Sequence, residues 1–502
     1  MAIEKGVQNL TQSKVQGVSY ENVGEEYFAK RGLRRHARAW SLWALGVGAV
    51  ISGDFFGWNY GLATGGCGGL FVATIIVSIM YIGLCYCLAE MSPALPHTGG
   101  AYSFARTTMG PWGGFITGLG ENMEYVITPG VIIISVGAYL QTIFNTPPEV
   151  QWVWWVIVFV IFVGLNVWGV ELSFKFTVVI TFIAMAILIF FFLAALSVFD
   201  FHKYALNMGI GADGNPVELP DGGGPFLPFG WDGVLKSLPF AIWFLLAIEQ
   251  LPLAAEESHD PKADMPKGLL WGILTLVILG FLTLLFNSSV PPGAFKLGSS
   301  AQPLLDGLIG IFGEGLGTKI LALLAVAGLI ASFHTIIYAY GRNIYSLSRA
   351  GYFPRWMSIT HGERRTPHVA LILGGVVGLV LALFMNYVFG TASYVGAALL
   401  NMAVFGAVIS YTMQGLSYYM LRRDFPHIER PYRSPLGNFG AVACMAIALL
   451  TLVYMFLNEA YRPGLWGALI WYVLGILYFA LAGRHKLVLS PEEQFALSHR
   501  KA

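Results

Sequence analysis

The sequence predicts an all-α integral membrane protein with twelve transmembrane helices, and three observations lead to this prediction. The 502-residue chain is 56% hydrophobic and only 11% charged, with a mean hydropathy of +0.65, which is membrane rather than soluble composition. Its apolar residues gather into twelve segments, each close to the roughly 20 residues that a helix needs to cross a bilayer. Its basic residues are concentrated in alternate loops.

The predicted spans follow one another with short separations. They lie near residues 41–63, 69–91, 113–140, 152–170, 174–199, 234–254, 268–290, 318–341, 368–388, 392–420, 439–458 and 463–482. A short turn near Glu171 joins the fourth and fifth. The two long loops, 200–233 and 291–317, are rich in Gly, Pro and Asp, which favours irregular lids over folded domains.

Loop charge predicts the orientation. With both termini in the cytoplasm, only five of the 29 Lys and Arg residues fall outside, namely Lys203, Lys236, Lys296, Lys319 and Arg462. We therefore expect a multi-pass protein of the cell membrane. Its predicted parts are a cytoplasmic tail (1–40), a first repeat of five helices (41–200), an extracytoplasmic loop (201–233), a second repeat (234–421), two further helices (437–483) and a cytoplasmic tail (484–502).

The first span contains a polar interruption at Ser52-Gly53-Asp54. Gly53 weakens a helix, and Asp54 is costly in hydrocarbon unless it is paired or hydrated. Unwound backbone at this depth is tolerated where it lines a cavity. We expect a broken helix that forms part of a substrate site, and the acid favours a cationic substrate. Asp54 could instead cap the half-helix that follows, or carry a coupling proton.

The sixth span carries a second interruption, where Glu249 and Gln250 precede Pro252. Proline removes a backbone donor and disfavours helical geometry at the residue before it. Interrupted helices at matching positions of two halves are typical of inverted-repeat transporters. Two repeats of five helices plus two extra helices account for the twelve spans.

Several motifs between about residue 30 and residue 435 resemble those of the amino acid–polyamine–organocation transporters, and most closely those of the ethanolamine permeases. The motifs are Arg31-Gly32-Leu33-Arg34-Arg35, Gly46-Val47-Gly48-Ala49-Val50-Ile51, the segment from Ala89 to Tyr102, Ala255-Glu256-Glu257 with Pro261 and Pro266, and the segment from Arg342 to Pro354. The resemblance implies a LeuT-type fold, with helices 1 and 6 discontinuous and alternating access as the mechanism. It places the substrate beside Ile51, Ser52, Gly53 and Asp54.

The chain departs from this family at the first interruption. Amino acid carriers have Gly-x-Gly there, and its bare N–H groups hold the substrate carboxylate, whereas Asp54 stands at the second glycine in this chain. A carboxylate side chain repels a substrate carboxylate and attracts an ammonium group. The departure therefore favours an amine without a carboxylate, such as ethanolamine.

The sixth helix supplies further candidates by the same resemblance. Glu249 aligns with an acidic gate residue and Trp243 with an aromatic gate residue, which could cover a bound cation by a cation–π contact. The alternative for Trp243 is ordinary packing. Ala247 replaces a family glycine and would narrow the pocket for a small substrate.

The third span contributes Glu121, Glu124 and Tyr125. The two acids are three residues apart and share a helix face, which is costly at membrane depth unless a cation or proton neutralises one. Glu124-Tyr125 matches a pair common in the superfamily, so a structural role and substrate contact are both open.

Ion coupling stays open. His334, near Ser332 and Thr335, could belong to a gate or coupling site, but a lone histidine in an apolar helix is more often a packed residue. The lysine that replaces sodium in some members is absent, since its position holds Ala184. Glu90, Glu256 and Glu257 lie at the cytoplasmic ends of predicted helices, so we expect them to pair with loop arginines in a closed gate rather than to bind substrate.

We therefore expect a secondary transporter that imports ethanolamine with a proton, with sodium or by the membrane potential alone. The alternatives are a choline, polyamine or cationic amino acid carrier of the same superfamily, a channel, or a transporter-like sensor. The sequence shows no pore-loop motif, no nucleotide-binding motif, and no metal-spaced or nucleophilic cluster, which disfavours a channel, a pump and an enzyme. We expect no cofactor and no metal centre, and the net charge of +1 gives no reason to expect nucleic acid binding.

Overall fold

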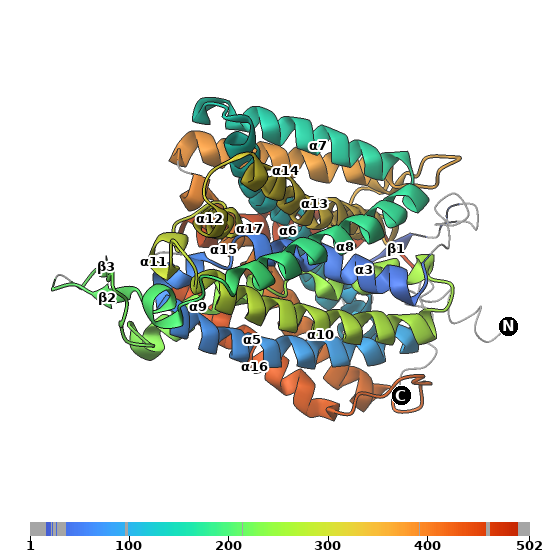
Figure 1. The fold of residues 1–502 in the computed structure, drawn as a ribbon. Coiled ribbons are helices and arrows are strands. Elements are labelled where there is room, and N and C mark those ends of the chain that lie inside the picture. Colours follow the sequence, from blue (N-terminus) through green and yellow to red (C-terminus); the bar gives the residue numbers. More distant parts are fainter. Residues whose placement is uncertain are drawn as a thin grey trace.

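The computed structural model describes residues 17–21, 23, 27, 37–95, 99–212, 214–390, 392–457 and 462–489. In this part of the chain long helices run side by side as one bundle (Figure 1). Eleven of the described helices are long and apolar enough to cross a membrane, and a shorter apolar helix, Ala39–Phe55, precedes them. Eleven of the twelve predicted spans overlap these long helices and the first overlaps the shorter one, so the predicted multi-pass membrane protein is confirmed. The predicted terminal tails lie largely outside the described residues.

The helices that carry the predicted spans have the following bounds. They are α3 (Ala39–Val50), α4 (Ser52–Phe55), α5 (Tyr60–Ala94), α6 (Ala101–Phe144), α7 (Gln151–Trp168), α8 (Val170–Ala195), α9 (Gly230–Trp243) with a 3-10 helix (Ile248–Glu257), α10 (Pro261–Ser288), α13 (Leu316–Arg349), α14 (His368–Phe389), α15 (Ala392–Asp424), α16 (Gly437–Leu457) and α17 (Arg462–Leu481).

Two of these helices, α5 and α6, each consist of two helical segments that meet at a bend. The backbone leaves helical geometry at Gly66 within α5, with φ of 67°, and at Gly110 within α6, with φ of 78°. Glycine tolerates these left-handed angles because it has no Cβ. The bend at Gly66 falls between the predicted first and second spans. The first span therefore consists of α3, α4 and the part of α5 that precedes Gly66.

Two details of the predicted boundaries are wrong. The turn between α7 and α8 is at Gly169, and Glu171 lies inside α8, where it forms an exposed ion pair of 2.8 Å with Lys175 one turn later. This spacing supports a helix rather than a turn. The loop 291–317 contains two short helices, α11 (Ala294–Leu297) and α12 (Pro303–Phe312). Proline at the start and one buried apolar face stabilise α12 despite its glycines.

Two small sheets mark the ends of the bundle. The strand β1 (Tyr20–Glu21) pairs in parallel with β4 (Leu487–Val488), and β2 (Met208–Ile210) pairs antiparallel with β3 (Pro216–Glu218). The β2–β3 hairpin and β1 lie at opposite ends in Figure 1, and we refer to the β1–β4 end and the β2–β3 end. Four short helical segments of about one turn complete the described structure: Pro148–Val150, Phe201–Ala205, Arg355–Ser358 and Gly483–His485.

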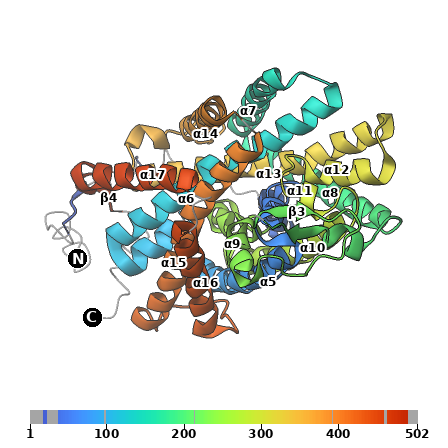
Figure 2. The same cartoon turned by 90° about the vertical axis from the view of Figure 1, so that its left-hand side faces the viewer.

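The interrupted helices lie in the interior. Viewed along the bundle, α7, α14, α16 and α17 lie outside, whereas α3 and α9 lie between other helices (Figure 2). The most apolar stretch of the Gly230–Glu257 span is 100% buried, compared with 22% for the spans that contain α7 and α17. The bundle therefore shields these two helices, and their polar residues, from lipid.

Candidate functional site

The interruption of the first helix begins later than the sequence predicts. Ile51 keeps helical angles, its N–H group bonds to the Val47 carbonyl, and Ser52, Gly53 and Asp54 form the short helix α4. The chain leaves helical geometry at Phe56, which is extended, and resumes a helix at Tyr60. The predicted break at Ser52-Gly53-Asp54 is thus corrected to residues 56–59, because Gly53 serves close packing rather than unwinding.

Gly53 and Gly57 allow the first interruption to contact the second. A Cβ atom on Gly53 would stand 2.5 Å from the carbonyl oxygen of Trp243, and one on Gly57 would stand 2.5 Å from the indole Nε1 of Trp243. Gly57 also has φ of +97°, which L side chains rarely adopt. Only residues without a side chain fit here, so these glycines bring the two interruptions together.

The second interruption, by contrast, begins earlier in the chain than the sequence predicts. The helix α9 ends at Trp243, and residues 244–247 form a turn in which Ala247 is left-handed, with φ of 85°. Glu249 caps this turn, since its carboxylate accepts the Ala247 N–H at 3.1 Å. Pro252 lies in the 3-10 helix that follows. Hydrogen bonds in a 3-10 helix join residues three apart, so Pro252 interrupts no α-helical i→i−4 bond there. An alanine held at φ above zero costs of order 1 kcal/mol, and such strain gathers at functional sites.

Trp243 joins the two interruptions by a hydrogen bond. Its indole Nε1 donates to the carbonyl oxygen of Phe56 at 2.8 Å, and its side chain is 3% exposed. The carbonyl of Phe56 would otherwise have no helical partner. Trp243 therefore has a structural role at this junction, in the region where the sequence predicts an aromatic gate.

Several backbone donors at the first interruption have partners within the protein. The N–H of Ser52 donates at 2.8 Å to Ser332 Oγ on α13, which in turn donates to the Gly48 carbonyl. The N–H of Asp54 bonds to the Ile51 carbonyl at 3.0 Å, and that of Gly57 bonds to the Asn59 side chain at 3.0 Å. A substrate carboxylate would have to compete with partners that the protein already supplies.

Three glutamates form a buried acidic cluster beside the second interruption. Glu121 and Glu124 on α6 are fully buried, and Glu249 is 1% exposed. Tyr125 links Glu121 to Glu249 through its hydroxyl, which is 3.4 Å from an oxygen of each, and Glu124 shares a helix face with Glu121. No ion pair among the described residues includes any of the three. The cluster therefore needs protons or a bound cation for charge balance.

Neutral polar groups surround this acidic cluster. Asn343 donates to Glu121 at 3.4 Å and accepts a bond from Asn122 at 3.1 Å. Tyr411 on α15 donates to Glu124 at 3.4 Å and is bonded to Tyr81 on α5 at 2.9 Å. These groups position the carboxylates without neutralising them. The sequence analysis missed them, although the polar run from Ser410 to Gln414 in an otherwise apolar span is a signal that could have found Tyr411.

Asp54 lies apart from the acidic cluster. It is 1% exposed, and neither carboxylate oxygen has a hydrogen-bond partner among the described residues. The hydroxyl of Thr283 on α10 is unpaired as well, and no hydrogen bond among the described residues joins Asp54 to the three glutamates. The structure therefore divides the predicted substrate residues between two places. Ile51, Ser52, Gly53 and Asp54 are in one, and Glu121, Glu124, Tyr125, Ala247 and Glu249 are in the other, with Trp243 between them.

His334 is held in the packed interior. Its Nδ1 accepts a bond from the Asn166 amide at 2.9 Å, and its Nε2 is 2.8 Å from the hydroxyl of Ser173. Because the NH₂ group of an amide can only donate, Nδ1 is the acceptor and Nε2 carries the ring proton. Both ring nitrogens are thus occupied, which favours the packing role over a coupling role.

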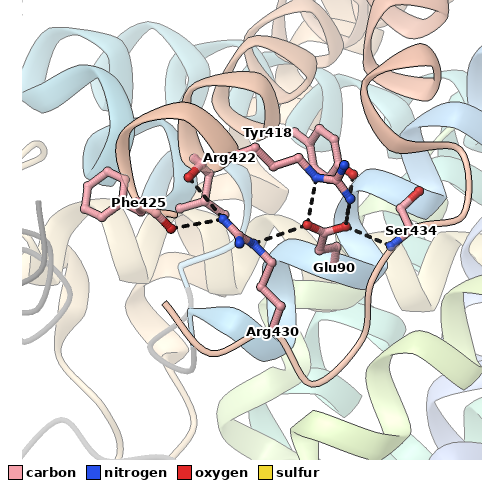
Figure 3. Close-up of polar contacts among 7 residues, drawn as sticks. Glu90, Tyr418, Arg422, Phe425, Arg430 and Ser434 are labelled. Carbon is pink, nitrogen blue, oxygen red and sulfur yellow. Dashed lines mark hydrogen bonds and ion pairs between the residues drawn. The ribbon is translucent and has the colours of Figure 1, made fainter. Parts of the chain in front are cut away.

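The β1–β4 end is closed by ion pairs of buried glutamates. Figure 3 shows Glu90 of α5 between the guanidinium groups of Arg422, at 2.6 Å, and Arg430, at 3.3 Å. The Tyr418 hydroxyl and the Ser434 N–H also donate to Glu90, at 2.9 and 2.8 Å. Burial lowers the pKa of Arg430, and the adjacent charge of Glu90 opposes this effect. The predicted pairing of Glu90 with loop arginines is confirmed.

Two further pairs lie at the same end. Arg342 and Glu257 are 2.8 Å apart and almost wholly buried, and Arg349 meets Glu256 at 2.6 Å. Both arginines are on α13, and both acids end the 3-10 helix of the second interruption. These pairs tie that interruption to the α13 scaffold.

A bundle of membrane-crossing helices, with two interrupted inner helices and unpaired buried acids beside them, defines a membrane transporter. The chain belongs to the amino acid permease family, whose model matches residues 38–481. This match confirms the predicted superfamily at the level of amino acid permeases and transporters.

The relatives of this chain transport several kinds of compound. The chain is 28% identical over 455 residues to an uncharacterized transporter of Rhizobium meliloti, which covers 89% of this chain and 91% of the relative. It is 25% identical over 486 residues to the methylthioribose transporter of Bacillus subtilis, with 91% and 95% covered. It is 24% identical over 464 residues to cationic amino acid transporter 7, chloroplastic, of Arabidopsis thaliana, with 88% and 73% covered.

Proposed function

We propose that this protein is a secondary transporter that imports ethanolamine, or a similar small amine without a carboxylate, by alternating access. The observation that carries the proposal is the combination of occupied N–H groups at the first interruption with unpaired buried acids at both interruptions. Such a site offers an ammonium group several acceptors, whereas a carboxylate would have to compete for the N–H groups of Ser52, Asp54 and Gly57.

The acidic cluster is the proposed place of the ammonium group. An ammonium group has three donors, and we place it among the carboxyl groups of Glu121, Glu124 and Glu249, two of which share the hydroxyl of Tyr125. The hydroxyls of Tyr125 and Tyr411 donate to glutamates, and their oxygens can still accept a hydrogen bond from the hydroxyl of an amino alcohol. An inside-negative potential would favour entry by about 2.3 kcal/mol per charge per 100 mV.

The ion pairs at the β1–β4 end are the proposed inner gate. They hold the 3-10 helix of the second interruption against α13, and α15 and the loop after it against α5. If water replaced the partner of each charged side chain in these ion pairs, the interrupted helices would be free to rock against the remaining bundle. With the termini in the cytoplasm, this gate would face the cytoplasm.

A cationic amino acid is the second candidate, and the relatives named as cationic amino acid transporters favour it. The acidic cluster suits its side chain equally well. The carboxylate of such a substrate needs hydrogen-bond donors in addition, however. At the first interruption the N–H groups of Ser52, Asp54 and Gly57 already donate to acceptors in the protein.

The test is uptake of labelled ethanolamine into proteoliposomes under a potassium-diffusion potential. Unlabelled ethanolamine, alanine, choline and lysine serve as competitors. We expect saturable uptake that excess ethanolamine blocks and that alanine and lysine leave unchanged. Block by lysine would replace the proposal with the cationic amino acid carrier, and block by choline alone would move the substrate to quaternary amines.

A further inference from the structure

We propose that a groove between α3 and α10, at the β1–β4 end, binds an anionic phospholipid of the surrounding bilayer. The phosphate contacts Lys267 and the indole N–H groups of Trp40 and Trp271, and the acyl chains follow the apolar faces of the two helices. This lipid site goes beyond the proposed function, because its occupation does not depend on which amine is carried.

The groove lies where α3 and α10 begin together. Ala37, just before α3, forms a bridge with Ser258, shortly before α10, and the His259 N–H donates to the Ala37 carbonyl at 3.0 Å. The two helices then run side by side (Figure 1) and approach closely at Gly268, where a Cβ would stand 3.1 Å from Leu42 Cβ. The cavity between them has a volume of about 490 Å³ and is lined by Ala39, Trp40, Trp43, Lys267, Trp271 and Thr275.

The lining of this groove offers hydrogen-bond donors and positive charge. Trp43 is only 8% exposed and closes the floor, where its indole donates to the Thr275 hydroxyl at 3.2 Å. No hydrogen bond or ion pair with a described residue involves the indole N–H groups of Trp40 and Trp271 or the ammonium group of Lys267. These three groups can only donate, and none of the lining residues is acidic. The matching ligand therefore carries several acceptor oxygens and a negative charge.

The same residues mark a membrane boundary. The helix α10 has no charged residue after Lys267, and α3 has none after Arg38, which precedes it. Each helix thus passes from a basic residue to a tryptophan within about one turn, at Trp271 and Trp40. Tryptophan is enriched at the interface between bilayer and water, and basic residues there attract anionic lipids.

The exposed tryptophans favour a phospholipid over a free anion. Trp40 is 75% exposed and Trp271 is 63% exposed, so both indole rings need an apolar partner in addition to an acceptor for the N–H group. Inorganic phosphate supplies the acceptor and leaves the rings uncovered. A zwitterionic lipid brings an ammonium group to a groove that has no acid in its lining. An anionic phospholipid meets the donors, the charge and the rings together.

The position of the groove gives the lipid a mechanical role. The helix α3 leads into the first interruption, and α10 follows the 3-10 helix of the second. A lipid bound between them braces the two interrupted segments at the end where the ion pairs of Glu256 and Glu257 lie. We therefore expect lipid binding to stabilise the closed arrangement of this end.

The experiment measures lipid binding to the purified full-length protein in neutral detergent micelles, without any amine. Thermal unfolding is followed during titration with dioleoyl phosphatidylglycerol, with dioleoyl phosphatidylcholine and dissolved glycerol phosphate in parallel series. We expect phosphatidylglycerol to raise the unfolding temperature saturably. Phosphatidylcholine should need at least a tenfold higher concentration, and glycerol phosphate should have no effect. In Lys267→Gln and Trp271→Leu the phosphatidylglycerol concentration at half effect should rise at least fivefold. Trp40→Leu serves if either variant does not fold.

Two variants serve as matched controls. Lys262→Gln changes an exposed lysine on the same helix that pairs with Glu429, and Trp466→Leu changes a tryptophan on α17 that is also 63% exposed. Both should respond like the wild type.

Three results would overturn the lipid site. They are equal stabilisation by phosphatidylcholine, a wild-type response in both groove variants, and a response to glycerol phosphate that matches the response to phosphatidylglycerol. Light scattering that shows two chains per micelle in the wild type and one in Trp271→Leu would instead assign the groove to a second copy of the chain. Because no amine is present, failure of ethanolamine uptake would refute the proposed substrate and leave the lipid site intact.

Discussion

The indole nitrogen of Trp243 donates a 2.8 Å hydrogen bond to the carbonyl oxygen of Phe56, and this bond links the interruptions of two helices far apart in sequence. Gly53 and Gly57 make the contact possible because a side chain at either position would collide with Trp243. The breaks of the first and sixth helices are therefore one structural unit. Changes that act on one break should be felt at the other.

Trp243→Phe should weaken this unit. The substitution keeps most of the ring but leaves the Phe56 carbonyl buried without a donor, at a cost of about 1–3 kcal/mol in the free energy of unfolding. We expect a lower unfolding temperature and at least a fivefold fall in ethanolamine uptake. Trp154→Phe is the control, because it removes a similar bond, to Thr146, at the half-buried periphery. Equal uptake by the two variants would contradict a special role for Trp243.

Glu249→Gln should separate function from stability. Glutamine keeps an oxygen for the Ala247 N–H but removes one of three clustered negative charges. We expect amine uptake to fall at least tenfold, while the unfolding temperature stays equal or rises because repulsion between buried carboxylates is lost. Glu124→Gln should behave in the same way.

The control for the glutamate variants is Glu171→Gln. Glu171 lies in an exposed pair with Lys175, so its loss should change the free energy of unfolding by less than about 1 kcal/mol and should leave uptake unchanged. Wild-type uptake by both cluster variants would exclude the acidic cluster as the amine site.

Glu90→Gln should loosen the β1–β4 end. The variant leaves the charges of Arg422 and Arg430 without their shared buried partner, which costs about 3 kcal/mol for pairs of this kind. If these pairs form the inner gate, the four buried free cysteines should also react faster with a thiol reagent. Arg423→Gln is the control, since its pair with Asp424 is exposed. A slower or unchanged thiol reaction in Glu90→Gln would argue against the gate.

His334→Ala should affect stability and leave ion coupling unchanged. The change removes bonds to Asn166 and Ser173 and leaves a cavity, at a cost of about 2–4 kcal/mol. At a temperature where the variant is folded, uptake should show the same dependence on pH and on sodium as the wild type. A changed pH dependence would restore His334 as a coupling residue.

The helices of this protein could be predicted from sequence because bilayer thickness sets their length and lipid sets their composition. Eleven of the predicted spans overlap helices long enough to cross a membrane, the first overlaps a shorter apolar helix, and the two helices predicted to be interrupted are interrupted. The position of each break could not be predicted. It depends on how Gly53 and Gly57 pack against Trp243, and local helix propensity does not contain that contact.

The same division applies to the site. The sequence by itself singled out Asp54, Glu121, Glu124 and Glu249, because an acid at membrane depth is costly and hence marks a site. Only the tertiary structure decided that the three glutamates gather around Tyr125 and Tyr411, whereas Asp54 has no hydrogen-bond partner among the described residues. The physical reason is that sequence fixes which charges must be buried, whereas the packing of α4, α6 and α10 fixes which buried charges share a neighbour.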